Sequence, residues 1–221
     1  MAFLSERIEQ LPTHKRRGRP LTIAPQARRA LVIDAAYKVF LEKGFAGTTT
    51  EMVAARASVS KRSLYEHFAS KTELFGAVVL KYRHLLLDLP RPPDDDLPMI
   101  DKLVKVFRLD MDRGRDQERE ALLNLILHQS VLFPELSDYL YQQKILRTRE
   151  DLIEWLEAER DRGAIEMDDV VLCAGMLMDI AFGALLPRRR QQGDDARDQR
   201  KQDIRQRFQI FLRGIAHQAD R

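Results

Sequence analysis

The chain has little of what several classes of protein require. Its one cysteine, Cys173, excludes an intramolecular disulfide and any zinc site built on paired cysteines, and such a residue is usually a small buried apolar group. No uncharged apolar run of about 18 residues exists to span a bilayer. The first residues also lack the basic start and apolar middle of a signal peptide, so we predict a cytoplasmic protein with no membrane partner.

Catalytic and metal-binding patterns are missing as well. The five histidines show no metal-ligand spacing, no glycine-rich phosphate loop appears, and no G-x-S-x-G segment marks a nucleophile. We therefore expect no metal, no cofactor and no catalytic residue. Three alternatives stay open from this pattern alone: a helical enzyme without a motif, a helical adaptor protein and a nonspecific nucleoid-binding protein.

Positive charge is concentrated toward the N-terminal end. Residues 1–70 hold 12 Lys and Arg against 6 Asp and Glu, whereas residues 71–221 hold 25 against 28, so a net charge of +6 is followed by −3. Between Thr13 and Arg29 there are six basic residues and no acidic one. Such a local excess is typical of a surface that binds a polyanion.

Helical periodicity dominates the chain and no alternating strand pattern competes with it, which predicts an all-α fold of about nine helices. We divide the chain into a flexible basic arm (1–23), a helix-turn-helix head (24–70) and a larger helical body (71–221). Glycine, proline and polar stretches separate the body helices, which we expect near residues 98–113, 116–131, 135–162, 168–186 and 200–218.

The first helix of the head has clear start and stop signals. Pro25 suits the first helical turn, and Gly44 ends the helix in a left-handed conformation. Phe45 should then fold back onto Phe40, the apolar contact expected after a glycine stop. The inward candidates of the next helix, TEMVAARA, are Met52, Val53 and Ala57.

A third helix is predicted from Ser60, a suitable cap, to Phe68. Together with the second helix and a short turn it forms a helix-turn-helix, whose second member lies in the DNA major groove. Leu64 and Phe68 should point inward and anchor it. Ser70 then caps a fourth helix that runs from Lys71 to about residue 89.

A protein that holds DNA needs cations and donors aimed at phosphates, and a few side chains that reach base edges. Arg62 lies in the first turn of the third helix, where two of its N–H donors can bond to the O6 and N7 atoms of a guanine. Taken alone, such a short basic helix is more often a solvated face, but the turn, the glycine stop and the basic arm favour DNA. The predicted DNA-binding residues of the head are Thr48, Thr49, Ser60, Lys61, Arg62, Ser63, Tyr65, His67 and Lys71.

The arm carries KRRGRP, in which Arg16, Arg17 and Arg19 lie near a glycine and a proline. This segment resembles the core of an AT-hook, where a slim extended backbone lets arginines enter a narrow A·T-rich minor groove. A disordered solubilising tail is the alternative interpretation. We expect the arm to add DNA contacts, and its A·T preference stays open.

The last two helices carry broad apolar faces. Spacing alone leaves two outcomes equally open, namely the closed core of a monomer and a bundle formed with a second copy of the chain. The candidate interface residues are Leu177, Ala181, Leu185, Ile204, Phe208, Phe211, Leu212 and Ile215.

A small-molecule pocket is harder to place, because its apolar and aromatic lining resembles an ordinary core. His128 is the polar candidate, although a buried and hydrogen-bonded histidine is the more common outcome. The candidate pocket residues on the body helices are Phe107, Met111, His128, Tyr139, Trp155, Met176 and Phe182.

The span from about Arg28 to Leu74 resembles the DNA-binding domain of the TetR family of bacterial transcriptional regulators. The resemblance rests on the AA…F…KGF end of the first helix, the threonine before the second, VS opening the third, LYxHF within it and SK-x-x-L opening the fourth. Two departures are Ser58, where the family usually has glycine, and Arg62, where it often has a small residue.

The resemblance implies more than the residues do. Family members are all-helical homodimers that pair through their last two helices, and most of them repress transcription. It therefore implies a double-stranded DNA operator, a small hydrophobic or aromatic effector bound in the body, and a self-partner. Effector identity, operator sequence and target gene do not follow from the sequence.

Overall fold

The computed structural model describes residues 25–91, 97–184 and 194–216, and within these ranges every regular element is a helix. This confirms the all-α prediction. The arm and Leu185 lie outside the described residues. The elements are α1 (Pro25–Gly47), α2 (Thr50–Arg56), α3 (Lys61–Tyr65), α4 (Lys71–Tyr82), the 3-10 helix η1 (Arg83–Leu85), α5 (Met99–Val106), α6 (Arg113–Leu132), α7 (Pro134–Gln142), α8 (Thr148–Asp161), α9 (Val170–Gly183) and α10 (Asp194–Ala216).

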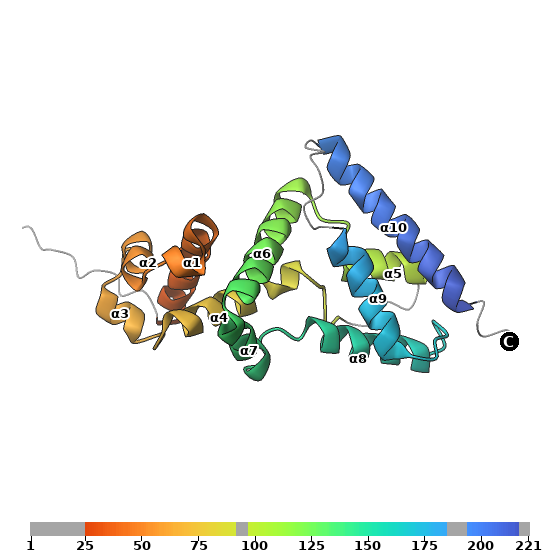
Figure 1. Ribbon diagram of the computed structural model, residues 1–221, viewed down its shortest axis with the longest axis horizontal. Helices are drawn as coiled ribbons and strands as arrows, with labels where there is room; N and C mark the ends of the chain where they lie inside the picture. The colour runs from red at the N-terminus through yellow and green to blue at the C-terminus, as the bar shows by residue number, and fades with distance from the viewer. Residues whose placement is uncertain (1–24, 92–96, 185–193, 217–221) are drawn as a thin grey trace, which may run out of the picture.

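The molecule is elongated, with α1 to α3 at one end and α5, α8, α9 and α10 at the other (Figure 1). Two apolar cores hold it together. The first joins α1 to α4 with α6 and α7, and the second lies among α5, α8, α9 and α10. Because the first core continues from the head into α4, α6 and α7, the domain boundary at residue 70 stays a prediction. Within the described ranges no helix is both long and apolar enough to cross a membrane.

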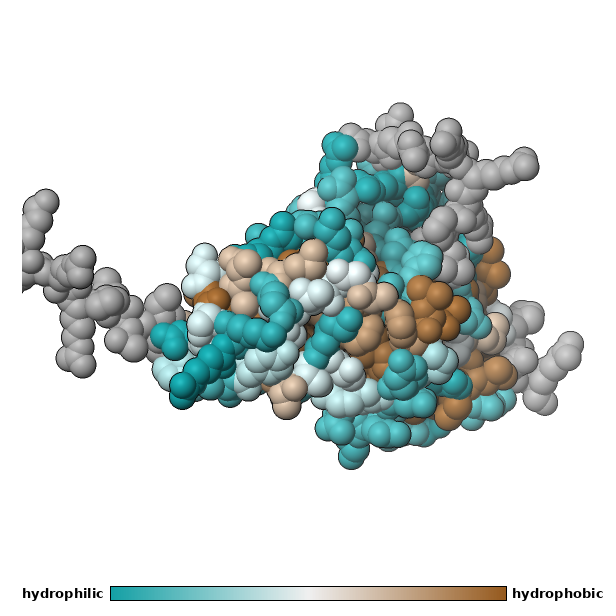
Figure 2. Space-filling view, turned by 60° about the vertical axis from the view of Figure 1, so that its left-hand side comes forward, coloured by the Kyte–Doolittle hydropathy of each residue, from teal (hydrophilic) through white to brown (hydrophobic). Residues whose placement is uncertain are grey.

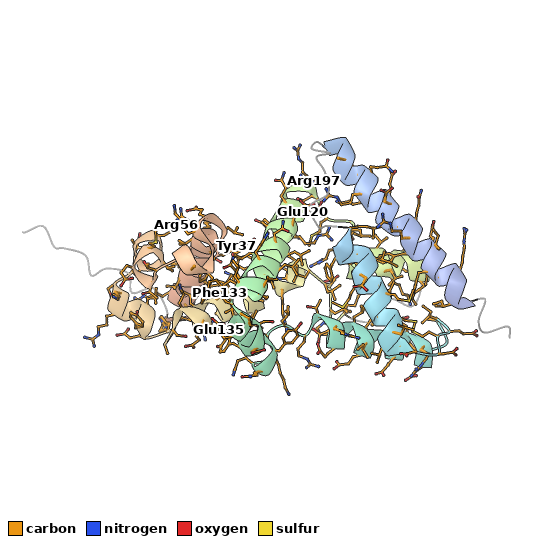
Figure 3. The ribbon with its side chains drawn as sticks, viewed as in Figure 1. Tyr37, Arg56, Glu120, Phe133, Glu135 and Arg197 are labelled. Carbon is orange, nitrogen blue, oxygen red and sulfur yellow. The ribbon has the colours of Figure 1, made fainter. Side chains whose placement is uncertain are left out.

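Helix α6 lies between the head and the start of α10 (Figure 1). Tyr37 of α1 is buried against it, and the Tyr37 hydroxyl donates to the Glu118 carbonyl at 3.3 Å. Burial, followed by the charge of Glu118, raises the pKa of Tyr37 to about 12. At the other side Glu120 of α6 faces α10, where Arg197 lies 3.8 Å away and Arg200 forms a second ion pair (Figure 3).

The turn after α1 confirms the glycine stop. Gly44 has a φ of 68°, in the left-handed region that favours glycine, although helical turns resume as far as Gly47. The Phe45 ring returns onto Phe40, with centroids 6.1 Å apart. Phe75 and Phe133 complete the cluster at 5.6 and 5.4 Å from Phe45, so the turn is packed by α4 and by the end of α6.

The predicted caps Ser60 and Ser70 are present, and Thr49 caps α2. The side chains of Thr49, Ser60 and Ser70 each accept a hydrogen bond from the backbone N–H three residues further on, at 3.2, 3.0 and 3.0 Å. At α4 a second bond is added, because the N–H of Ala69, one residue before the cap, donates to the Glu73 carboxylate at 2.7 Å. The two bonds together fix the direction in which α4 leaves the head.

Several predicted boundaries are wrong. The expected helix 135–162 is two helices, α7 and α8, broken near Lys144, which has a φ of 53°. The helix expected to reach residue 113 ends at Val106, and Arg108 has a φ of 57°. The fourth helix ends at Tyr82 instead of residue 89, and the last begins at Asp194 instead of residue 200. The breaks at Arg108 and Lys144 have no glycine or proline at the left-handed residue. The usual helix-breaking residues therefore gave no signal for them.

Helices α4 and α7 approach closely at Gly76. A Cβ at this position would lie 2.8 Å from Ile145 Cδ1 and 2.8 Å from Tyr139 Cε1. Real Cβ contacts are not that short, so hydrogen at position 76 is what allows the two helices to meet.

The turn of the helix-turn-helix contains a strained residue. Ser58 has a φ of 54°, a conformation in which the Cβ of an L-residue meets the backbone. This is also the position at which the resemblance implied glycine. The turn is therefore kept at some cost in stability.

Replacing Ser58 by glycine should relieve this strain. Ser58→Gly is expected to raise the free energy of unfolding by about 1 kcal/mol, less a small loss from the freer unfolded chain. Urea denaturation followed by circular dichroism measures the change. Ser58→Ala is the control, because alanine keeps the Cβ and the strain. Equal midpoints for the two variants would contradict the explanation.

Candidate nucleic-acid interface

The first turn of α3 presents two cations, each held by an exposed acidic partner. The Arg62 side chain is 91% exposed, and its Nε donates at 3.2 Å to Glu66, about one helical turn further along the chain. Lys61 forms an ion pair with Glu51 of α2, which lowers the pKa of Glu51 to about 2 and raises that of Lys61. Exposed pairs of this kind contribute little to stability, so a stronger anion such as phosphate can replace the carboxylates.

Tyr65 is fixed on the same surface by a residue of α2. Its ring is 45% exposed, and its hydroxyl lies 3.0 Å from the Thr50 hydroxyl. Nothing in the sequence distinguishes Thr50, because three consecutive threonines lead into α2 and their order does not indicate which one faces α3. The bond holds the phenol at the junction of α2 and α3, beside the Lys61 ammonium 5.9 Å from the ring.

The opposite face of α3 anchors it, as predicted. Leu64 and Phe68 are 0% and 1% exposed. The guanidinium of Arg29, on α1, lies 4.9 Å from the Phe68 ring, so a cation of the first helix reaches the end of the α3 segment. His67 is half-buried beside Phe68, at 6.4 Å between ring centroids.

Two predicted DNA-binding side chains are turned away from the surface. Thr48 is 1% exposed, because its hydroxyl donates to the Gly44 carbonyl at 2.6 Å and closes the turn. The Ser63 hydroxyl oxygen is shielded from solvent and has no hydrogen-bond partner among the described residues. In the free chain neither hydroxyl is open to a phosphate or a base edge, and the role of both residues in DNA binding stays a prediction.

The Lys71 ammonium forms hydrogen bonds with backbone carbonyls of the head. Its ammonium donates to the Phe45 carbonyl at 2.7 Å and to the Thr48 carbonyl at 3.1 Å, and it lies 4.4 Å from the Phe45 ring. Burial lowers the pKa of this lysine. The side chain thus closes the carbonyl end of α1, a position that α6 also contacts because the Phe45 N–H donates to Gln129 at 3.0 Å.

The predicted dimer residues lie largely inside one chain. Leu177, Ala181, Ile204, Phe208 and Phe211 are at most 6% exposed within the second core, and Leu212 and Ile215 pack against it. Periodicity identified their inward face correctly, but it could not tell a monomer core from an interface.

The exposed apolar side chains of α9 and α10 are different ones. They are Val171 at 49%, Leu172 at 61%, Met176 at 46% and Ile210 at 68%. In Figure 2 apolar colour gathers over the body half of the molecule, whereas the head is mostly hydrophilic on the face shown. A partner helix would meet these residues and leave the buried set in place.

The seven predicted pocket residues are not brought together. Phe107 is a core residue, packed on Phe182 and Phe208 with centroids 6.1 and 5.1 Å apart, and Met111 is buried in the first core. Tyr139 packs against α4 and Met176 is exposed.

Three of the seven line cavities, and these are separate. Met111 borders one between α6 and α10. His128 is exposed on α6, with Nδ1 3.1 Å from the Asn124 carbonyl, beside an open cavity against α1. Trp155 borders a larger cavity at α8. Within the part of the chain that the structure describes, no group of three His, Cys, Asp or Glu side chains is placed to hold a metal ion.

The partners of Lys71 generate a stability prediction. Lys71→Ala leaves the carbonyls of Phe45 and Thr48 without their charged donor, and we expect the free energy of unfolding to fall by about 1–2 kcal/mol. Lys61→Ala is the control, because its exposed ion pair should leave the urea midpoint nearly unchanged. Unfolding measured without DNA separates this effect from DNA affinity. If the Lys71→Ala protein is as stable as the wild type, the bonds from Lys71 to the two carbonyls do not stabilise the fold.

Comparison with known proteins agrees with this geometry. Residues 32–78 match the family model described as bacterial regulatory proteins, tetR family, and residues 101–214 match the model described as AefR-like transcriptional repressor, C-terminal domain.

Individual relatives are more distant. The repressor SCO4008 of Streptomyces coelicolor is 35% identical over 81 residues, which cover 36% of this chain and only 42% of the relative. The regulator UidR of Escherichia coli is 24% identical over 161 residues, 72% of this chain and 81% of the relative. The solved structure of the flavonoid-responsive regulator FrrA is 26% identical, with a TM-score of 0.55 over 86% of this chain and 97% of that one. Because the C-terminal model by itself matches more than half of the sequence, the chain belongs to the TetR family of transcriptional regulators, which are DNA-binding proteins and not enzymes.

Proposed function

We propose that the chain is a repressor that binds its operator as a homodimer in the cytoplasm and leaves it when a small molecule binds the body. The observation that carries the proposal is the two-sided character of α3. Its inner residues are fully packed, while its outer cations are held only by exposed carboxylates. The matching C-terminal family model is described as a repressor domain, which supports repression over activation. A related structure is named as flavonoid-responsive, which supports a small-molecule effector.

Different side chains of the head have different tasks in this proposal. Arg62 extends furthest from the surface and reads a base edge, most simply a guanine. Lys61 and Tyr65 bind phosphates on either side and set the register. Thr49 at the start of α2, Ser60 at the start of α3 and His67 after α3 complete the contacts to the DNA backbone. The arm residues Arg16, Arg17 and Arg19 follow the adjacent minor groove.

A second copy supplies the second head. Helices α9 and α10 pack against each other and expose Leu172, Met176 and Ile210 on their outer sides. Pairing these apolar residues across a two-fold axis forms a four-helix bundle. The two α3 helices then meet successive major grooves, about 34 Å apart, of a palindromic operator.

Exchanging the base-reading residue should alter sequence choice. Arg62→Ala is expected to lower affinity for the operator of its own promoter about tenfold and to reduce discrimination against operators with a changed base, because one bidentate contact contributes about 1–3 kcal/mol. Lys61→Ala, the matched control in the same turn, should weaken binding to all sequences alike and flatten the salt dependence. Fluorescence anisotropy with labelled duplexes at several salt concentrations measures both.

The alternatives have distinct outcomes in that experiment. Equal affinity of the wild-type protein for promoter and random DNA would favour nonspecific nucleoid binding. Uniform loss in both variants would remove Arg62 from base reading.

Charge placed on the exposed side of α9 should separate the dimer. The double variant Leu172→Asp, Met176→Asp is expected to sediment as a monomer and to lose most operator affinity, because a single head makes half of the contacts. Val131→Asp is the control, since Val131 on α6 is 80% exposed and lies outside this surface. Analytical ultracentrifugation reports the mass. A dimeric double variant would place the interface elsewhere.

A further inference from the structure

A cavity of ≈ 520 Å³ lies on the body side of α4. Its walls come from η1, the segment that follows it, the link between α7 and α8, and α8 itself. Ligand sites in proteins usually measure about 300–1,000 Å³, so the space suits a small organic molecule.

The cavity combines an apolar wall with an unusual number of cations. Leu89, Pro90, Trp155 and Ala158 supply the apolar surface, and Trp155 is only 9% exposed. Two lining residues, Asp151 and Glu154, are acidic. The five basic lining residues are Arg83, Arg91, Lys144, Arg147 and Arg162.

The two acids are already paired with a single arginine. Arg147 donates to Glu154 at 2.7 Å and lies 3.8 Å from Asp151. Burial raises the pKa of Asp151, with Arg83 and Arg147 opposing the shift. Arg91 and Arg162 pair with acids outside the lining, Asp88 at 3.7 Å and Glu159. The lining itself holds five cations against two carboxylates.

Two of these cations are placed to bind a further anion. The Arg83 guanidinium donates to the Ile145 carbonyl at 3.1 Å and shares the charge of Asp151 with Arg147. Lys144 lines the cavity and is exposed, and it has no acidic partner among the residues that the structure describes. A carboxylate placed between them would gain charge-assisted hydrogen bonds, while its apolar part would cover Trp155.

We propose that this cavity is the effector site and that it binds a small organic anion, a carboxylate joined to an aromatic or aliphatic body. The inference rests on the proposed ligand-responsive repressor and adds a charge to the expected hydrophobic or aromatic effector.

The position of the cavity explains how such a ligand would act on the head. Arg83 directly follows the last residue of α4, whose first residue, Lys71, closes the carbonyl end of α1. A carboxylate shared by Arg83 and Lys144 ties the end of α4 to the link between α7 and α8. Ligand binding thus shifts the balance between two positions of α4, and with it the separation of the heads.

The chain offers a direct probe, because Trp155 is its one tryptophan. Titrating the full-length protein with phenylbutyrate should change the tryptophan emission, whereas phenylbutyramide, of nearly the same shape but neutral, should bind about tenfold more weakly. The affinity for the acid should fall as salt is added, and that for the amide should not.

Substitutions locate the charge that is recognised. Arg83→Gln and Lys144→Gln are each expected to weaken phenylbutyrate binding about tenfold and to leave phenylbutyramide unchanged. Lys144 is exposed, so its variant keeps the fold even if Arg83→Gln loses stability. Arg160→Gln is the matched control, because Arg160 lies on α8 outside the lining and should leave both ligands unaffected.

Three results would overturn the assignment: equal affinity for the acid and the amide, no change of emission with either, or acid binding that both lining variants leave intact. Operator binding without phenylbutyrate is measured separately. A protein that binds its operator but not the acid would lose this effector site and keep the repressor function.

Discussion

The placement of the head depends on one constraint, namely that the backbone polar groups of the short turn between α1 and α2 form hydrogen bonds. Where α1 ends, its last carbonyls have no donor within the helix. Residues from two other helices form hydrogen bonds with the carbonyls and with a neighbouring N–H. Lys71 from α4 donates to two carbonyls, and Gln129 from α6 accepts from the Phe45 N–H. The helix-turn-helix is therefore positioned by body helices, so movement of α4 or α6 reorients the DNA-reading surface as a unit.

The surface of α3 shows why a free regulator is ready to bind DNA. Its cations are paired with Glu51 and Glu66, which limits their repulsion in the absence of DNA. Because these pairs are exposed, opening them costs little, and phosphates offer more charge than the carboxylates they displace. The packed inner face, held by Leu64 and Phe68, keeps the helix in place while its outer partners change.

Local signals in the sequence predicted local structure well. The glycine stop, the return of Phe45 and the caps at Ser60 and Ser70 each depend on a few neighbouring residues, and each is present. Failures arose where the outcome depends on distant contacts. Met52, expected inside, is 40% exposed, and the apolar stripes of α9 and α10 fill their own core because α5 and α8 cover them. The cationic cavity was missed since its lining comes from segments that only the fold brings together.

The close approach at Gly76 has an evolutionary consequence. Because Ile145 and Tyr139 occupy the space of a missing Cβ, a chain that acquires alanine there must shorten one of these two side chains or separate α4 from α7. Positions 76, 139 and 145 are thus expected to covary among homologues. Since Ile145 also offers its carbonyl to Arg83, a substitution at this one helical glycine would also displace a wall of the cavity beside α8.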